Sequence, residues 1–292
     1  MQYSLTYRET NVAIDSHGGE LVSFRDSSGL EYIWSGDPAF WSGRNPLLFP
    51  IVGNLKNGEV SIQGRTYRMS RHGFARDNEF TLLEKTDDSI TLELRENRAT
   101  LECYPFPFSL QVCHRVMNDG FSTTYRVENT GGLPMPFCIG AHTAFRCPLR
   151  AGERCEDYAV GFDSPQTASM RLLSSDGLLT ELREPVLEGQ NSFPLDRSVF
   201  RRVDTMIFDD LSVKAVSLLN LETGHGVRME FSGFPMLAFW TKGDTDAPFI
   251  CMEPWHGCAA LTDETGNFTD KPGCIVLSAG ESKTFSYTVY TR

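Results

Sequence analysis

Short stretches of alternating apolar and polar residues are the dominant pattern of this chain. In the segment SITLELREN, Ile90, Leu92 and Leu94 are separated by polar neighbours. A period of two places the apolar side chains on one face of a β-strand and the polar ones on the other. Apolar residues at helical spacing are nearly absent, apart from single turns near 38–40 and 196–202.

Several of these stretches come in pairs joined by turn residues, which predicts β-hairpins. The expected hairpins cover residues 61–69, 109–129, 216–233 and 274–292, with turns at Gln63-Gly64, Asn118-Asp119-Gly120, Thr223-Gly224-His225-Gly226 and Ala279-Gly280-Glu281. Many short strands without intervening helices indicate an all-β fold, a large antiparallel β-sandwich. No internal repeat or low-complexity linker divides the chain, so we expect one domain over residues 1–292.

Composition agrees with a globular protein of the cytoplasm. The chain has 292 residues, 40% of them hydrophobic, which is enough for a large core. No run of about 18 apolar residues is present, so we expect no membrane contact. The N-terminal MQYSLTYRET lacks the basic and apolar regions of a signal peptide. The eight cysteines form no CxxC pair and are interpreted as reduced core thiols.

Charge and residue spacing narrow the range of ligands. The net charge of −11 disfavours nucleic acid, whose binding calls for a basic stripe. It leaves small neutral ligands open, and a phosphate could bind where basic residues converge. Cysteines and histidines do not occur at the short spacings of a zinc site, so we expect neither a metal nor another cofactor. The expected assembly is a monomer or a homodimer.

Four segments place polar side chains against apolar or glycine-containing runs, where burial of a charge is costly. They are GRNPLLFPIVGNLKNGEV with Arg44 and Asn54, RHGFARDNEF with His72 and Arg76, PFCIGAHTAFRCPL with His142, and FICMEPWHG with Glu253. Taken singly, each polar residue has a structural explanation, such as a core histidine or a solvated turn. Taken together, a histidine and a glutamate at the ends of apolar strands could face one another and perform acid–base chemistry.

These segments resemble the aldose 1-epimerase (galactose mutarotase) family, in particular its LacX-like branch. The matching stretches are NPLLFPIVGNLKNG, HGFARDNEF, GAHTAFRCPL, VDTMIFDDL and CMEPWHG, which follow the family's order and spacing. The fold of the family is a large antiparallel β-sandwich, in agreement with the strand pattern. The resemblance implies an isomerase of carbohydrate metabolism that interconverts the α and β anomers of a hexose such as glucose or galactose.

The resemblance also implies a role for each matching residue. Glu253 corresponds to the general base, His142 to the general acid, and His72 to a histidine that binds the sugar near its ring oxygen. The nearby His256 is ambiguous because it lies three residues after Glu253. The implied reaction needs no metal or nucleotide, since neither hydride nor phosphate is transferred.

Five further positions are implied to contact the sugar. Asp204 matches an aspartate that holds sugar hydroxyls, Trp240 resembles a residue that lines the sugar pocket, and Arg76 matches the arginine of HGFAR. Much of the family has arginine where this chain has Asn54, so the preferred sugar differs or Arg44 or Arg76 supplies the missing charge.

Three other functions compete with this interpretation. A hexose-6-phosphate mutarotase would need a basic pocket, for which the candidates are Arg44, Arg71, Arg76 and Lys242. A non-catalytic carbohydrate-binding module or sensor would suit the tryptophans, which are Trp34, Trp41, Trp240 and Trp255. A glycoside hydrolase would need two carboxylates, and Asp204 is the best partner for Glu253.

Overall fold

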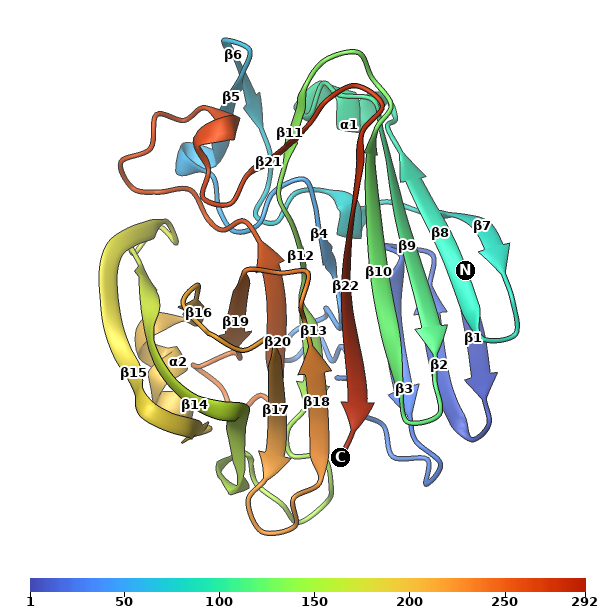
Figure 1. The fold of residues 1–292 in the computed structure, drawn as a ribbon, viewed down its shortest axis with the longest axis vertical. Coiled ribbons are helices and arrows are strands. Elements are labelled where there is room, and N and C mark those ends of the chain that lie inside the picture. The colour runs from blue at the N-terminus through green and yellow to red at the C-terminus, as the bar shows by residue number, and fades with distance from the viewer.

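The computed structural model describes residues 1–292 and consists mainly of β-strands (Figure 1). The helices are α1 (Arg98–Cys103), α2 (Arg197–Val203) and the single 3₁₀ turns η1 (Lys56–Gly58), η2 (Ala75–Asp77), η3 (Cys155–Asp157) and η4 (Phe268–Asp270). None of them has the length and apolar character that crossing a bilayer requires.

The chain forms 22 strands. Those before residue 138 are β1 (Gln2–Tyr7), β2 (Thr10–Asp15), β3 (Glu20–Arg25), β4 (Leu47–Leu48), β5 (Glu59–Ile62), β6 (Arg65–Arg68), β7 (Thr81–Lys85), β8 (Ser89–Arg95), β9 (Phe108–Val116), β10 (Gly120–Asn129) and β11 (Met135–Phe137). The remaining strands are β12 (Ile139–Ala141), β13 (Thr143–Arg146), β14 (Tyr158–Leu173), β15 (Leu179–Pro194), β16 (Thr205–Phe208), β17 (Ala215–Asn220), β18 (Gly226–Glu230), β19 (Met236–Trp240), β20 (Phe249–His256), β21 (Ile275–Leu277) and β22 (Ser282–Thr291).

Fifteen strands form one antiparallel sheet that packs against itself. Its order is β4-β12-β20-β19-β16-β14-β17-β18-β22-β10-β9-β8-β7, with β13 beside β20 and β15 beside β14. Leu92 and Val112 from one end of this sheet share a single buried cluster with Phe239 and Met252 from the other end. The two ends therefore enclose a common core, and the predicted antiparallel β-sandwich is confirmed (Figure 1).

Three of the four predicted hairpins are present, and one prediction was wrong. Strands β5–β6, β9–β10 and β17–β18 pair as expected. In residues 274–292, however, β21 pairs with β11, whereas β22 pairs with β10 and β18. The turn residues predicted where the chain reverses, but the burial of Ile275 and Leu277 against another segment decides the pairing.

The apolar pattern predicted the location of one of the two α-helices and missed the other. Helix α2 lies within the predicted turn at 196–202, whereas residues 38–40 form only a turn. Helix α1 was missed, although its start carries a recognisable signal. The Asn97 side chain accepts a hydrogen bond from the Thr100 amide, and the Thr100 side chain accepts one from the Asn97 amide. This reciprocal capping stabilises a helix too short for apolar periodicity to reveal.

Strand β20 separates two environments. Ile250 and Met252 point into the main core, as expected for alternate residues of a strand. Cys251, Glu253 and Trp255 occupy the opposite face, and all three are buried there. The carboxylate is therefore buried on the face of the sheet that does not pack into the main core.

Phe49 gives a test of the packing in the main core. Its ring is fully buried and lies 5.2 Å from the ring centroid of Phe108 and 5.9 Å from those of Tyr104 and Phe137. We expect Phe49→Ala to lower the free energy of unfolding by about 3–5 kcal/mol in denaturant titrations, because it leaves a cavity. Leu221→Ala, at a side chain that is 66% exposed, should change it by less than about 0.5 kcal/mol. Similar effects of the two substitutions would contradict the burial of Phe49.

Candidate active site

His142 and Glu253, the expected acid and base, lie against one another. Strands β12 and β13 flank His142, and both pair with β20, which carries Glu253. This pairing places His142 Nε2 3.2 Å from Glu253 Oε2. The two residues are only 7% and 1% exposed, respectively. Two groups that are far apart in the chain thus form a buried pair.

Burial dominates the electrostatics of this pair. Loss of solvent raises the pKa of Glu253 well above its ordinary value, and the positive charge of Arg71 opposes that rise. Loss of solvent also lowers the pKa of His142 to about 3, with further lowering by Arg71 and Arg76. Both shifts favour the neutral forms. A carboxylic acid beside a neutral imidazole has as many protons as a carboxylate beside an imidazolium, so moving one proton interconverts them.

Neither oxygen of Glu253 has a hydrogen-bond donor. The contact with His142 is close but lacks hydrogen-bond alignment, and His142 Nδ1 is also unpartnered. Buried polar atoms are nearly always hydrogen-bonded in folded proteins, so unpartnered ones indicate a ligand site. The sulfur of Cys251 adjoins the pair on the same face of β20, and one donor atom each from Cys251, His142 and Glu253 lie within 4.8 Å of one another.

His72 is held as a neutral hydrogen-bond donor. The Gly53 amide donates to His72 Nδ1 at 3.1 Å, while Arg71 Nε approaches Nε2 at 3.2 Å. Burial lowers the pKa of His72 well below its ordinary value, so the ring is neutral and has a single acceptor nitrogen. The Gly53 contact is fixed by the backbone, which assigns the proton to Nε2. Because Arg71 Nε also carries a proton, a ligand oxygen is a better partner for Nε2 than this side chain.

Asp204 lies at the end of helix α2 in a strained backbone conformation. Its φ of 60° and ψ of −64° are rarely adopted by residues with a side chain. Its carboxylate accepts a hydrogen bond from Trp240 Nε1 at 3.3 Å and lies 3.7 Å from Arg71 Nη2. His72 also has a positive φ, of 70°. Such strain is concentrated at functional sites, which agrees with a ligand-binding role for both residues.

Two tryptophans enclose the imidazole of His142. The ring of Trp41 lies at a centroid distance of 4.8 Å with an interplanar angle of 31°, and that of Trp240 lies at 5.5 Å. Trp41 is half-buried, whereas the imidazole beneath it is almost inaccessible. The ring of Trp255 packs against Gly140, where a Cβ atom would approach its Cδ1 to 2.6 Å. These rings form an apolar wall that keeps water from the acid–base pair.

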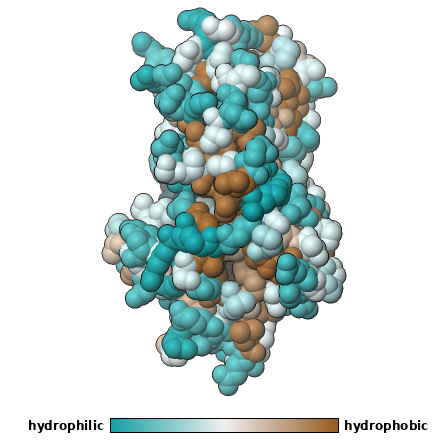
Figure 2. All heavy atoms as spheres, turned by 90° about the vertical axis from the view of Figure 1, so that its left-hand side faces the viewer, coloured by the Kyte–Doolittle hydropathy of each residue, from teal (hydrophilic) through white to brown (hydrophobic).

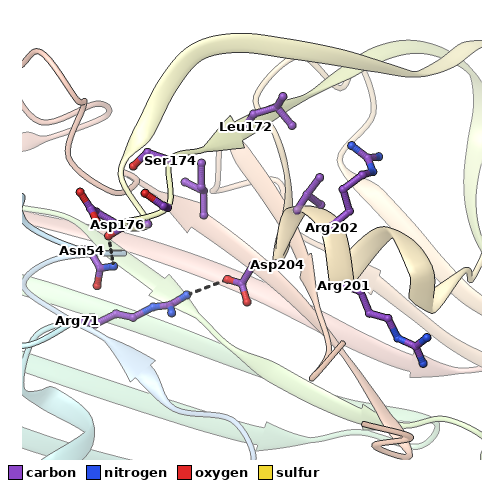
Figure 3. Close-up of a pocket in the computed structure, with 12 residues that line it drawn as sticks. Asn54, Arg71, Leu172, Ser174, Asp176, Arg201, Arg202 and Asp204 are labelled. Atoms are coloured by element: carbon purple, nitrogen blue, oxygen red, sulfur yellow. Dashed lines mark hydrogen bonds and ion pairs between the residues drawn. The ribbon is translucent and has the colours of Figure 1, made fainter. Parts of the chain in front are cut away.

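The other predicted residues surround this centre at different distances. Asn54 donates to the carbonyl of Asp176, in the turn that joins β14 to β15 (Figure 3). Arg76 donates to the carbonyl of Arg71 and thereby supports that residue. The side chain of Arg44 donates to the carbonyl of Val22, and its amide donates to Glu20.

Arg71 and Trp41 were considered only under the competing functions, Arg71 for a phosphate pocket and Trp41 for a carbohydrate-binding module, and not as site residues of the mutarotase. One signal for Arg71 was available, because it directly precedes His72 in the chain. Trp41 lies in a loop with no matching motif, and only its contact with His142 identifies it. Arg71 is the cation nearest the predicted sugar-binding carboxylate, because its guanidinium contacts Asp204.

A polar hollow adjoins the acid–base pair without reaching it. It has a volume of about 590 Å³, and its lining includes Asn54, Arg71, Ser174, Arg201 and Asp204. The contact between Arg71 and Asp204 crosses one side of it (Figure 3).

A second hollow, of about 770 Å³, lies beyond Asp204 and is also lined by Trp240 and Lys242. On the face that carries β14, β15 and α2, apolar residues gather near the centre among polar ones (Figure 2). Neither hollow is lined by Glu253 or His142. A ligand in either hollow therefore reaches these two residues only after side chains such as Arg71 move.

Trp41→Ala tests whether the aromatic wall keeps His142 neutral. Water entering the site lowers the cost of charging the imidazole, so the pKa of His142 should rise from about 3 toward the ordinary value of about 6.5. His114 is the matched control, because burial in another hairpin lowers its pKa to about 4. A pH titration of the imidazole signals by NMR measures both. Equal shifts of the two residues, or no shift of His142, would contradict the screening by Trp41.

Comparison with known proteins agrees with this geometry. The sequence model of the family described as aldose 1-epimerase matches residues 1–290. Protein LacX of Lactococcus lactis subsp. lactis is 36% identical over 99% of both chains. A galactose mutarotase related enzyme from Lactobacillus acidophilus has a structure that aligns with a TM-score of 0.92 at 29% identity, covering 100% of this chain and 97% of that one. A galactose mutarotase-like protein from Lactobacillus casei aligns with a TM-score of 0.93 at 29% identity over the whole of both chains. The chain therefore belongs to the aldose 1-epimerase family.

Proposed function

We propose that this protein is an aldose 1-epimerase that interconverts the α and β anomers of a free hexose. The observation that carries the proposal is the buried contact of 3.2 Å between His142 and Glu253. These residues match the acid and the base that the family resemblance implies. Family membership supports the same class of isomerase.

In the proposed reaction, the anomeric centre of the sugar lies between the two groups. The Glu253 carboxylate removes the proton of the anomeric hydroxyl, while the His142 imidazolium donates a proton to the ring oxygen. The bond between the anomeric carbon and the ring oxygen breaks, and an aldehyde forms. Rotation about the C1–C2 bond presents the other carbonyl face, and ring closure reverses both proton transfers. No proton is gained or lost over the cycle.

The proton balance of the buried pair suits this sequence of steps. Ring opening leaves Glu253 protonated and His142 neutral, which are the forms that burial favours. The starting state has a carboxylate and an imidazolium, and it needs polar groups for stabilisation. The positive charge of Arg71 lowers the pKa of Glu253 and so favours the carboxylate. Sugar hydroxyls that donate to its unpartnered oxygens would add to this effect.

The surrounding side chains would orient the sugar. His72 Nε2–H can donate to the ring oxygen or a hydroxyl, because Gly53 occupies the other ring nitrogen. Asp204 accepts from Trp240 and has remaining acceptor capacity for sugar hydroxyls. The rings of Trp41 and Trp240 offer apolar surface to the carbon–hydrogen faces of the sugar. Binding requires Arg71 to turn away from His72 and to exchange its contact with Asp204.

The cationic groups near the hollow favour an unphosphorylated sugar. Arg202 is already paired with Glu184 through contacts of 2.6 Å and 2.7 Å. The side chains of Arg201 and Arg202 extend away from Arg71 (Figure 3). A phosphate is best held by several guanidinium groups that converge on it. Arg76 lies beside Arg71 and donates to its carbonyl, but Arg201 and Arg202 do not converge with them, so we favour a free hexose over a hexose 6-phosphate.

Substitution of the acid and the base is the direct test of the mechanism. We expect Glu253→Gln and His142→Asn each to lower the rate of mutarotation by about 10²–10⁴-fold, because each removes one proton transfer. Polarimetry of freshly dissolved α-glucose or α-galactose measures this rate. His256→Asn is the matched control, since this histidine contacts the carbonyl of Gly273 outside the pair. Near-full activity of folded Glu253→Gln protein would overturn the assignment.

The choice of sugar can be tested with a matched pair of substrates. We expect a higher kcat/KM for glucose or galactose than for the corresponding 6-phosphates, because Arg201 and Arg202 do not converge with Arg71. NMR exchange between the two anomers measures both sugars under the same conditions. A 6-phosphate preferred by about tenfold or more would identify a hexose-6-phosphate mutarotase. Sugar binding without faster exchange of either substrate would identify a carbohydrate-binding protein instead.

A further inference from the structure

Cys251 is a buried thiol next to the acid–base pair that the proposed reaction does not use. It lies two residues before Glu253 on β20, so both side chains project from the same face of the strand. One donor atom each of His142, Cys251 and Glu253 lie within 4.8 Å of one another. All three residues are buried. Nitrogen, sulfur and carboxylate oxygen are the ligands that zinc prefers in proteins.

The separations are close to those of a metal-bound state. With ordinary zinc–ligand bonds, a tetrahedral centre holds nitrogen and oxygen ligands about 3.3 Å apart, and sulfur about 3.6 Å from either. The observed distance from His142 Nε2 to Glu253 Oε2 is 3.2 Å. The sulfur of Cys251 belongs to a set of three donor atoms that lie within 4.8 Å of one another, so a movement of up to about 1 Å would bring it to the ion. The fourth position is left to water.

The unpartnered oxygens of Glu253 point independently to a ligand. Glu253 is 1% exposed, yet neither oxygen has a hydrogen-bond donor. The polar groups near it are His142, which faces Oε2 without hydrogen-bond alignment, the unpartnered indole nitrogen of Trp255, and the charged side chains of Arg71 and Asp204. A divalent cation would satisfy the carboxylate without requiring a donor at hydrogen-bond geometry. Trp41 and Phe249 flank the site and lower its polarity, which strengthens attraction between opposite charges.

We propose that His142, Cys251 and Glu253 form a binding site for one thiophilic divalent cation such as Zn²⁺, and that this cation inhibits the enzyme. The thiol and the carboxylic acid of Glu253 each release one proton on binding, and the thiolate, the imidazole nitrogen and the carboxylate each donate an electron pair to the metal. Both proton-transferring groups are then occupied, so the metal and the sugar compete. Inhibition rests on the proposed function, whereas cation binding does not.

Titration with Co²⁺ tests the site directly in the intact protein after removal of metals with a chelator. Thiolate ligation of Co²⁺ gives a charge-transfer band in the near ultraviolet, and Zn²⁺ should abolish it by displacement. We expect saturation at one equivalent. Cys251→Ser should remove the charge-transfer band and weaken Zn²⁺ binding by at least about 100-fold. Loss of a residue that only hydrogen-bonds to a metal ligand already lowers metal affinity by about 10–100-fold. Cys258→Ser, at a buried thiol in a separate apolar cluster, should bind as the wild type does.

A second measurement keeps the proposal testable if Cys251→Ser fails to fold. Zn²⁺ binding to the wild type, measured calorimetrically, should weaken as glucose or galactose is added, because the two ligands share the site. In mutarotation assays, Zn²⁺ should inhibit the wild type and Cys258→Ser equally, each relative to its own metal-free rate. Absence of the charge-transfer band, or an unchanged band in Cys251→Ser, would overturn the site. A normal band in a protein without mutarotase activity would uphold the site and reject the proposed function alone.

Discussion

The burial of a carboxylate beside an imidazole is the constraint on which the rest of this structure depends. Removing an ionisable group from water costs several kcal/mol unless other groups compensate. Burial favours the neutral forms of Glu253 and His142, which limits that cost, yet the Glu253 oxygens and His142 Nδ1 have no hydrogen-bond partner. The surrounding strands must therefore stabilise two side chains, Glu253 and His142, whose burial is unfavourable.

The sheet meets this requirement because alternate residues of β20 face opposite sides, one packed in the main core and the other lining the site. Ile250 and Met252 fix β20 in the main core, while Cys251 and Glu253 point to the other side. The neighbouring strands β12, β13 and β19 pair with β20 along its length. A carboxylate on such a central strand is positioned more rigidly than one on a loop. Arg71 and Trp41, by contrast, lie on connecting segments.

Much of the fold follows from the sequence because burial is periodic. Alternating residues such as Ile90 and Leu92 identified strands, and turn residues identified three hairpins. Pairing between distant segments was harder to predict from the sequence, because local turn residues do not specify which strand a strand pairs with. Strand β21 is the example. The long ladder of β14 and β15 also escaped prediction, since its register shifts several times and interrupts the alternation.

The candidate site divides in the same way. Glu253 and His142 could be recognised because each is a polar residue in an apolar run. The contributions of Arg71 and Trp41 arise from contacts between segments, which one sequence does not encode locally. The family resemblance led us to expect an arginine at the position of Asn54, and motif comparison alone could not identify a substitute. The nearby guanidinium belongs to Arg71, which comes from a different segment.

The backbone at Asp204 has a consequence for the evolution of this protein. Its positive φ is unfavourable for any residue with a Cβ atom, and glycine would adopt it without strain. A lineage selected for stability alone would therefore tend to lose this aspartate and, with it, the partner of Arg71 and Trp240. Retention of a strained residue at this position marks a compromise between folding and recognition. An engineering programme that seeks heat resistance should leave this position unchanged.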